Sequence, residues 1–175
     1  MSISFSELQQ LLRGEDIRFF VEPGAPRALF AASGLHGSYN VAVMLELDGE
    51  FLQLRALQYL RCAADHPHLL AVLKTIAHIN YQKRLVKFAW DPADGEVTLY
   101  ADLWVSDGTV TQGQFNRLTG SFLRALDLSF PAIKAALETG QQTGESELPA
   151  GFEALVEKFL RGGGPKKDDP EVTEI

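Results

Sequence analysis

The sequence predicts an α+β fold in which an antiparallel sheet, built largely from hairpins, packs against helices. Two turn-forming segments, Asp48-Gly49 and the stretch from Asp91 to Gly95, each separate runs of alternating apolar residues, as in β-hairpins. Stretches with helical spacing of apolar residues lie before, between and after these hairpins. Hairpins make the sheet antiparallel, and interspersed helices cover one of its faces.

Residues 4 to 32 are expected to form a short helix and two strands. Ser4 and Glu7 have the spacing of a capping box, and Gly14 is placed to end the helix. The apolar stripe of this helix consists of Leu8, Leu11 and Leu12. Two apolar runs follow at residues 17–21 and 28–32, each ended by turn residues, and both are predicted to be strands.

The first hairpin has a predicted register, because Asp48-Gly49 supplies the positive φ angles of a tight two-residue turn. With these two residues at its centre, one face of the hairpin is consistently apolar, which supports the register. The predicted opposing pairs are Leu45 with Leu52, Val43 with Leu54, and Val41 with Ala56.

Asp65 is placed to cap a helix that has Pro67 in its first turn and is predicted to end near Asn80. Its predicted apolar stripe is Leu69, Leu70, Leu73, Ile76 and Ala77. The second hairpin follows, and its predicted pairs are Trp90 with Val97 and Phe88 with Leu99.

Another capping box, Thr111 with Gln114, opens a helix that Pro131 is expected to break or kink. Ser129 is placed to cap a second helix, which ends at Gly140. The predicted organisation is an α+β domain over residues 1–140, a linker and C-terminal helix over 141–161, and a disordered tail over 162–175. The apolar stripe of the C-terminal helix is Phe152, Leu155, Val156 and Phe159.

Composition and charge exclude several classes of protein. The 175 residues are 46% hydrophobic and carry a net charge of -7, which argues against nucleic acid or an anionic membrane as partner. We find neither a signal peptide nor an apolar run of about 20 residues that would cross a bilayer. Cys62 is the only cysteine, so no internal disulfide forms. The predicted location is the cytoplasm.

No motif for catalysis or for a cofactor is present. The sequence lacks a P-loop, and the segment around His36 lacks the spacing of a nucleophile elbow. His66 and His68 flank a proline, a spacing that does not place both on one helical face for a metal. We therefore predict no catalytic residue, no metal site and no cofactor. A hydrolase that uses the loop around His36 is the least favoured hypothesis.

The face of the sheet that points away from the predicted core is not plainly polar. Five of its residues are our candidates for binding a partner: Met44, Leu57, Tyr59, Tyr100 and Trp104. A solvated face does not ordinarily carry so many large apolar side chains. Three kinds of cover are possible: the C-terminal helices of the same chain, a second copy of the chain, or a peptide partner.

The stretch from Ile79 to Leu137 resembles the YbjN-like family, whose fold is shared with class I type III secretion chaperones. The matching features are Ile79-Asn80, Lys87-Phe88, the turn from Asp91 to Val97, Gln114-Phe115, and Phe130-Pro131 with Ile133. The resemblance implies a small, acidic, non-enzymatic protein that often dimerises and holds an extended client peptide on hydrophobic patches. Our leading hypothesis is a peptide-binding chaperone or adaptor. The alternative is a regulatory or structural homodimer whose outer sheet face is the subunit interface.

Overall fold

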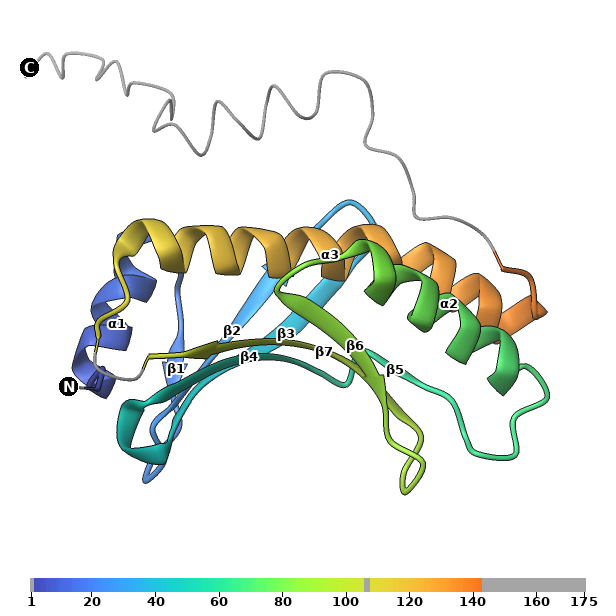
Figure 1. Cartoon of the computed structure of the whole chain (residues 1–175), viewed down its shortest axis with the longest axis horizontal. Helices are drawn as coiled ribbons and strands as arrows, with labels where there is room; N and C mark the ends of the chain where they lie inside the picture. The colour runs from blue at the N-terminus through green and yellow to red at the C-terminus, as the bar shows by residue number, and fades with distance from the viewer. Residues whose placement is uncertain (1, 106–107, 143–175) are drawn as a thin grey trace, which may run out of the picture.

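One layer of the structure is a seven-stranded antiparallel sheet, and the other layer consists of helices packed on one face of it (Figure 1). This computed structural model describes residues 2–105 and 108–142. The predicted α+β class is therefore confirmed. In chain order the elements are α1 (Phe5–Gly14), β1 (Phe20–Val21), β2 (Arg27–Ser33), β3 (Ser38–Glu46), the 3-10 turn η1 (Leu47–Gly49), β4 (Phe51–Leu57), β5 (Leu60–Arg61), α2 (Leu69–Gln82), β6 (Val86–Trp90), β7 (Glu96–Trp104) and α3 (Gln112–Thr139).

The strands follow the order β1-β2-β3-β4-β7-β5, and β6 also pairs with β7. One side of β7 pairs with β4 and then with the short β5, and the opposite side pairs with β6. The sheet therefore has two edges, β6 at one end and β2 with its two-residue partner β1 at the other. The predicted strand over residues 17–21 is much shorter in the structure, where only Phe20 and Val21 pair with β2.

Both predicted hairpin registers are confirmed. Leu45 lies opposite Leu52 in the first hairpin, and Phe88 lies opposite Leu99 in the second. The first connection is longer than the predicted two-residue turn, because pairing stops at Glu46 and Phe51. Leu47, Asp48 and Gly49 all have positive φ. Gly49 is required here, since a Cβ at this position would lie 2.0 Å from the Ile3 carbonyl oxygen.

The two predicted capping boxes are present, at the N-termini of α1 and α3. The prediction for α2 was less accurate. This helix begins at Leu69, and its N-cap is His68, three residues after the predicted cap Asp65. Its buried face consists of Val72, Thr75, Ile76 and Ile79, whereas Leu70 is 64% exposed. The predicted stripe was thus rotated relative to the side that packs on α3 and β6.

The prediction of two helices separated at Pro131 was wrong. A single helix, α3, runs from Gln112 to Thr139 with Pro131 inside it, and Gly140 ends it with φ 73° as expected. Ser129, the predicted cap, is fully buried within the helix. Buried residues on both sides of the proline, among them Leu126 and Ile133, belong to the same core. Tertiary packing therefore outweighs the hydrogen bond lost at the proline.

The core lies between the sheet and the helices. Its largest fully buried side chains are Leu8 and Leu12 from α1, Val41, Val43, Leu52, Leu54 and Leu99 from the strands, Ile79 from α2, and Phe115, Phe122, Leu126 and Ile133 from α3. Within the described residues, no helix is long and apolar enough to cross a membrane. The predicted C-terminal helix and tail lie outside the described residues.

Candidate functional site

The candidate site is the face of the sheet opposite α1, α2 and α3, which we call the outer face. Figure 1 shows the three helices together on the other side of the sheet. Strand partners in an antiparallel sheet point to the same side, so the register assigns the members of this face. They are Phe20 of β1, Arg27, Leu29, Ala31 and Ser33 of β2, Ser38, Asn40, Ala42, Met44 and Glu46 of β3, Phe51, Gln53, Arg55 and Leu57 of β4, Arg61 of β5, Glu96, Thr98, Tyr100, Asp102 and Trp104 of β7, and Lys87 and Ala89 of β6.

Four of the five predicted binding residues lie on the outer face. Trp104 is 62% exposed, and Met44, Leu57 and Tyr100 are partly buried. They do not form one cluster. Trp104 and Met44 lie toward the η1 end of the face, Tyr100 lies in the middle, and Leu57 lies at the opposite end of β4.

The predicted position of Tyr59 on the outer face was wrong. Gln58 has φ 52°, and this left-handed residue interrupts the alternation of sides after Leu57. The Tyr59 ring turns into the core, where its hydroxyl donates to the Leu126 carbonyl oxygen at 2.7 Å. Its ring also packs edge-on against Phe130, with centroids 5.5 Å apart. Tyr59 joins β4 to α3 and is 7% exposed.

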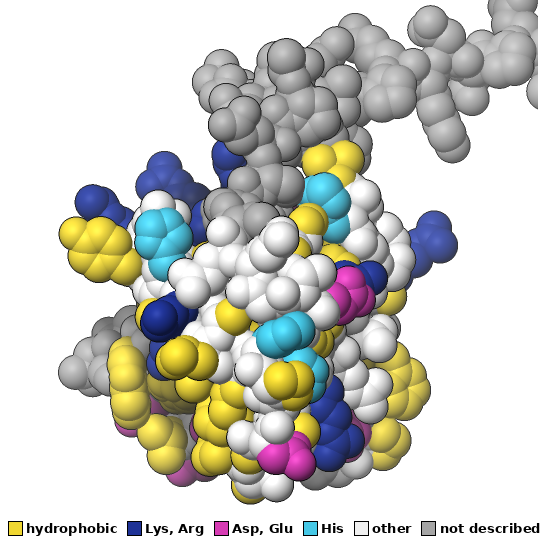
Figure 2. Space-filling model, turned by 90° about the vertical axis from the view of Figure 1, so that its right-hand side faces the viewer, with side chains coloured by type: hydrophobic (Ala, Val, Ile, Leu, Met, Phe, Trp, Pro, Cys, Tyr) yellow, Lys and Arg dark blue, Asp and Glu magenta, His cyan; other side chains and the backbone are white. Residues whose placement is uncertain are grey.

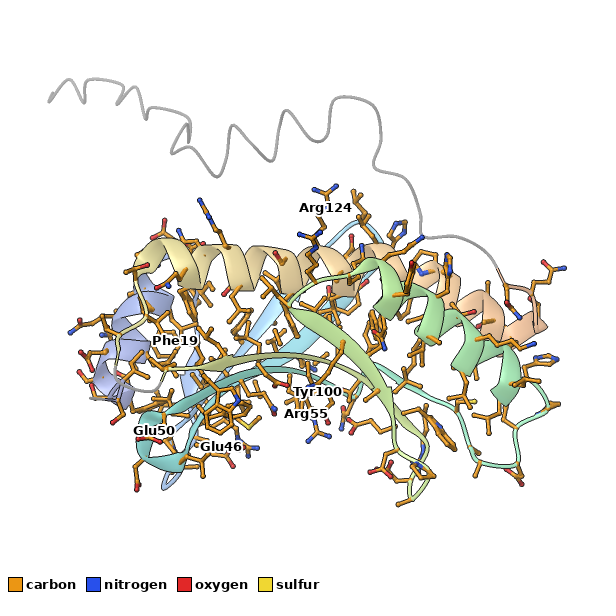
Figure 3. All side chains as sticks on the ribbon, in the orientation of Figure 1. Phe19, Glu46, Glu50, Arg55, Tyr100 and Arg124 are labelled. Atoms are coloured by element: carbon orange, nitrogen blue, oxygen red, sulfur yellow. The ribbon has the colours of Figure 1, made fainter. Side chains whose placement is uncertain are left out.

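The η1 end of the outer face is aromatic. Phe51 and Trp104 are strand partners, and their ring centroids lie 5.0 Å apart at a tilt of 57°. Met44 lies one strand further along the sheet, opposite Gln53. Glu46 lies close by, and Figure 3 shows it with Glu50 at this end of the sheet. A large exposed indole packed against a phenyl ring offers apolar contact area with a polar N–H at its edge.

The middle of the outer face is charged but internally paired. Asp102 accepts a hydrogen bond from the Gln53 amide at 2.8 Å and forms an ion pair with Lys87. Arg55 forms an ion pair with Glu96, and its guanidinium lies over the Tyr100 ring at 5.3 Å. Figure 3 shows Arg55 and Tyr100 on the side of the sheet away from α3. These pairs fix the side chains and cancel their charges.

The far end of the outer face is hollowed. A depression of about 520 Å³ extends across β2, β3 and the end of β4, next to Glu96. Its lining includes Leu29, Ala31, Asn40 and Leu57. The face thus presents an aromatic end, a paired polar centre and an apolar depression in sequence along the strands.

The two edges of the sheet differ. At β6, the Asn80 side chain of α2 donates to the Phe88 carbonyl oxygen at 2.9 Å and accepts from the Phe88 N–H at 2.7 Å. The carboxamide thus occupies both outward-facing backbone groups of Phe88, as a neighbouring strand would. At the other edge, β1 pairs only with Ala28 and Leu29. In the described part of the chain, β2 from Phe30 onward has no strand on that side.

The turn between β2 and β3 is held to α3 by a buried carboxylate. Asp127 accepts hydrogen bonds from the N–H groups of Leu35 and His36, each at 2.8 Å, and from the Tyr39 hydroxyl at 2.9 Å. Gly34 allows this approach, since a Cβ there would lie 2.3 Å from the carboxyl group. Burial, together with the hydrogen bond to Asp127 and its charge, raises the pKa of Tyr39 well above its usual range.

No arrangement for catalysis emerges from the described residues. Among them, no three His, Cys, Asp or Glu side chains lie close enough together to hold a metal ion. Burial raises the pKa of the Cys62 thiol, which favours the unreactive form. On the end of the molecule drawn in Figure 2, positive and negative side chains are interspersed with hydrophobic ones.

Comparison with protein families gives a match over residues 4–135 to the YbjN family, described as "Putative bacterial sensory transduction regulator". The chain belongs to the YbjN family. No curated protein matches the chain significantly. The resemblance expected from residues Ile79 to Leu137 is thereby confirmed, and the family match extends to the N-terminal helix and the first hairpin.

Three solved structures are similar to this YbjN-family chain at low sequence identity. A crystal structure of YbjN from E. coli is 15% identical with a TM-score of 0.56, covering 76% of this chain and 91% of that one. A chain of the ExsC-ExsE complex is 16% identical with a TM-score of 0.54, covering 76% and 97%. A chain of the HopA1-SchA chaperone-effector complex is 14% identical with a TM-score of 0.49, covering 70% and 90%. The first two show that this chain shares the fold of YbjN and of a chain of the ExsC-ExsE complex.

Sequence reasoning missed two side chains that shape this YbjN-family structure. Asn80 was predicted to lie where a helix ends, whereas it lies inside α2 and binds the edge of β6. Asp127 received no role, although a carboxylate between Leu126 and Leu128 in an apolar helix is unusual. Its partners are about ninety positions away in the chain, so only the fold reveals them.

Proposed function

We propose that this protein is a non-enzymatic, chaperone-like adaptor that holds a segment of a protein client against the outer face of its sheet. The observation that carries the proposal is the exposed Trp104 beside Phe51, on a face that none of the helices in the described residues covers. Family membership and the fold shared with a chain of the ExsC-ExsE complex support a role in protein binding.

The distribution of polarity on the outer face favours an extended, partly apolar client. Arg55 and Asp102 already have partners, so a client does not need to supply charges for them. Its apolar side chains contact the Phe51–Trp104 pair and the depression near Leu57, which lie at opposite ends of the face. Large aromatic side chains dominate such interfaces because they bury much area with few rotatable bonds.

Backbone pairing at the edge of β2 adds to this binding. Asn80 closes the β6 edge at Phe88, whereas the β2 edge from Phe30 to Ser33 is open within the described residues. This edge also adjoins the depression lined by Leu29 and Ala31. A client strand added there gains main-chain hydrogen bonds and places alternate side chains toward the depression.

The same exposed face supports the alternative, a homodimer in which a second copy covers it. The two proposals differ in what covers Trp104, and the molecular mass of the protein in solution distinguishes them. We further propose a cytoplasmic location, consistent with the single cysteine and the net charge of -7.

The test compares the wild type with Trp104→Glu and a matched control, Tyr81→Glu. Tyr81 is 90% exposed on α2, on the opposite side of the sheet from the outer face. Each protein is immobilised and offered a native-source extract, and captured proteins are quantified by mass spectrometry. We expect one partner captured in stoichiometric amount by the wild type and Tyr81→Glu, and at least about tenfold less by Trp104→Glu.

Circular dichroism and sedimentation are measured on the same three proteins. Equal capture by a folded Trp104→Glu protein refutes client binding at the outer face. A wild type that sediments as a dimer, with Trp104→Glu as a monomer and no captured partner, replaces the adaptor with the homodimer.

A further inference from the structure

A second surface, on α3 and away from the outer face, has the shape of a docking groove. It is a depression of about 870 Å³ flanked by the β2–β3 turn and by the loop between α2 and β6. Its lining includes Leu35, Leu85, Gly113, Arg117, Gly120 and Arg124. Arg124 projects from α3 away from the sheet in Figure 3. The groove therefore lies on the helical side of the molecule.

The groove combines apolar rims with a floor that another helix can approach closely. Leu35 is 46% exposed and Leu85 is 63% exposed, which is unusual for leucines on a solvated surface. On α3, Gly113 and Gly120 leave open space where a Cβ would stand. Absent side chains at these two positions let the backbone of a neighbouring segment lie near that of α3.

The C-terminal part of the sequence contains an apolar stripe for which the described core offers no position. Phe152, Leu155, Val156 and Phe159 have the i, i+3, i+4, i+7 spacing of one helical face. A helix of about nine residues does not form stably in water by itself, because the nucleation cost exceeds the gain from its few hydrogen bonds. Such a stripe requires an apolar surface to pack against.

We propose that residues 152–160 of this chain dock as an amphipathic helix in the α3 groove. The chain is long enough. The distance along α3 from Thr139 back to Leu128 is about 16 Å. The connecting residues 140–151 can span up to about 40 Å when extended. A nine-residue helix rises about 13 Å, close to the length of α3 from Leu128 back to Gly120.

Charge supports this occupant over an arbitrary apolar helix. The groove carries the cationic side chain of Arg117, while its acidic residue, Asp127, accepts hydrogen bonds from the β2–β3 turn. Residues 143–160 contain four Glu and one Lys, and Glu153 and Glu157 flank the apolar stripe. Opposite charges along the rim favour the docked state and orient the helix. This inference does not depend on the proposed role of the outer face.

Hydrogen exchange on the full chain tests the docking. We expect the amides of residues 152–160 to exchange at least tenfold more slowly than those of an unstructured chain. Gly120→Glu, which adds a bulky negative group to open space in the groove, is expected to return them to unstructured rates. The matched control is Thr139→Glu, an exposed position on α3 outside the groove, which should leave protection unchanged.

Three results overturn the inference: unstructured exchange rates in the wild type, protection that survives Gly120→Glu, or protection lost in Trp104→Glu instead. The last would place the segment on the outer face and also count against the proposed client site. If protection merely survives in Gly120→Glu, the docking inference fails, but the proposed client site on the outer face is unaffected.

Cross-linking distinguishes this chain's own segment from that of a second copy. In a Cys62→Ser background, Gly120→Cys and Leu155→Cys are introduced together and oxidised at low protein concentration. We expect a disulfide within one chain, seen as a monomer with altered mobility. A disulfide-linked dimer would mean that the groove is filled by a second copy, and no disulfide would mean that the two positions do not meet.

Discussion

The buried carboxylate of Asp127 offers the sharpest test of how α3 and the first strands are joined. Asp127→Ala removes the acceptor of three hydrogen bonds, from the N–H groups of Leu35 and His36 and from the Tyr39 hydroxyl. The partners lie on the β2–β3 turn and the start of β3, so the substitution detaches that turn from the helix.

The expected loss follows from the burial of these groups. A hydrogen bond to a charged group contributes about 1.5–3 kcal/mol, and a buried donor left unpaired costs about 1–3 kcal/mol. When the carboxylate is absent, the N–H groups of Leu35 and His36 in the turn can bond to water instead. Tyr39 is only 8% exposed, so its hydroxyl does not gain a water partner. We therefore expect the free energy of unfolding to fall by about 3 kcal/mol, or the Tm by about 6–12 °C.

Urea unfolding followed by circular dichroism measures this loss, with Glu138→Ala as the control. Glu138 also lies on α3, but its side chain is 59% exposed and its ion pair with Lys134 is 3.7 Å long, so its removal should cost under about 0.5 kcal/mol. A loss below about 1 kcal/mol for Asp127→Ala refutes the reasoning. So does unchanged hydrogen exchange at Leu35 and His36.

Two further predictions concern Asn80 and Tyr39. Asn80→Ala removes the hydrogen-bond partner of both backbone groups of Phe88. We therefore expect the free energy of unfolding to fall by about 1–2 kcal/mol and self-association to appear at high concentration in sedimentation. A monomer of unchanged stability would contradict this. Tyr39 keeps its proton in the folded state because its pKa is raised, whereas in the unfolded state it ionises near pH 10. Its stabilising contribution is therefore complete below about pH 10 and declines above it, so the stability difference between the wild type and Tyr39→Phe should shrink as pH rises from 9 to 11; a constant difference would contradict the assignment.

The sequence alone determined the local features of this protein. Alternation of apolar residues around Asp48-Gly49 was sufficient to place Leu45 opposite Leu52, because a shift by one residue would have turned the apolar set to water. The capping boxes at Ser4 and Thr111 likewise marked helix starts, since their partners lie three residues away. The family resemblance came from such features in order.

For the candidate site, the sequence placed Met44, Leu57, Tyr100 and Trp104 on one side of the sheet. It misplaced Tyr59, because nothing in the local pattern reports that Gln58 adopts a left-handed conformation. The role of Met44, Leu57, Tyr100 and Trp104 in binding a partner stays a prediction.

The tertiary structure alone decided the features that depend on distant partners. A proline ordinarily interrupts a helix, yet α3 continues through Pro131 because residues on both sides of it are buried in one core. Asn80 and Asp127 have roles only through backbone groups that the fold brings to them, eight and about ninety positions away. Local patterns encode the preferences of short segments, whereas the choice between competing preferences is made by burial and hydrogen bonding across the chain.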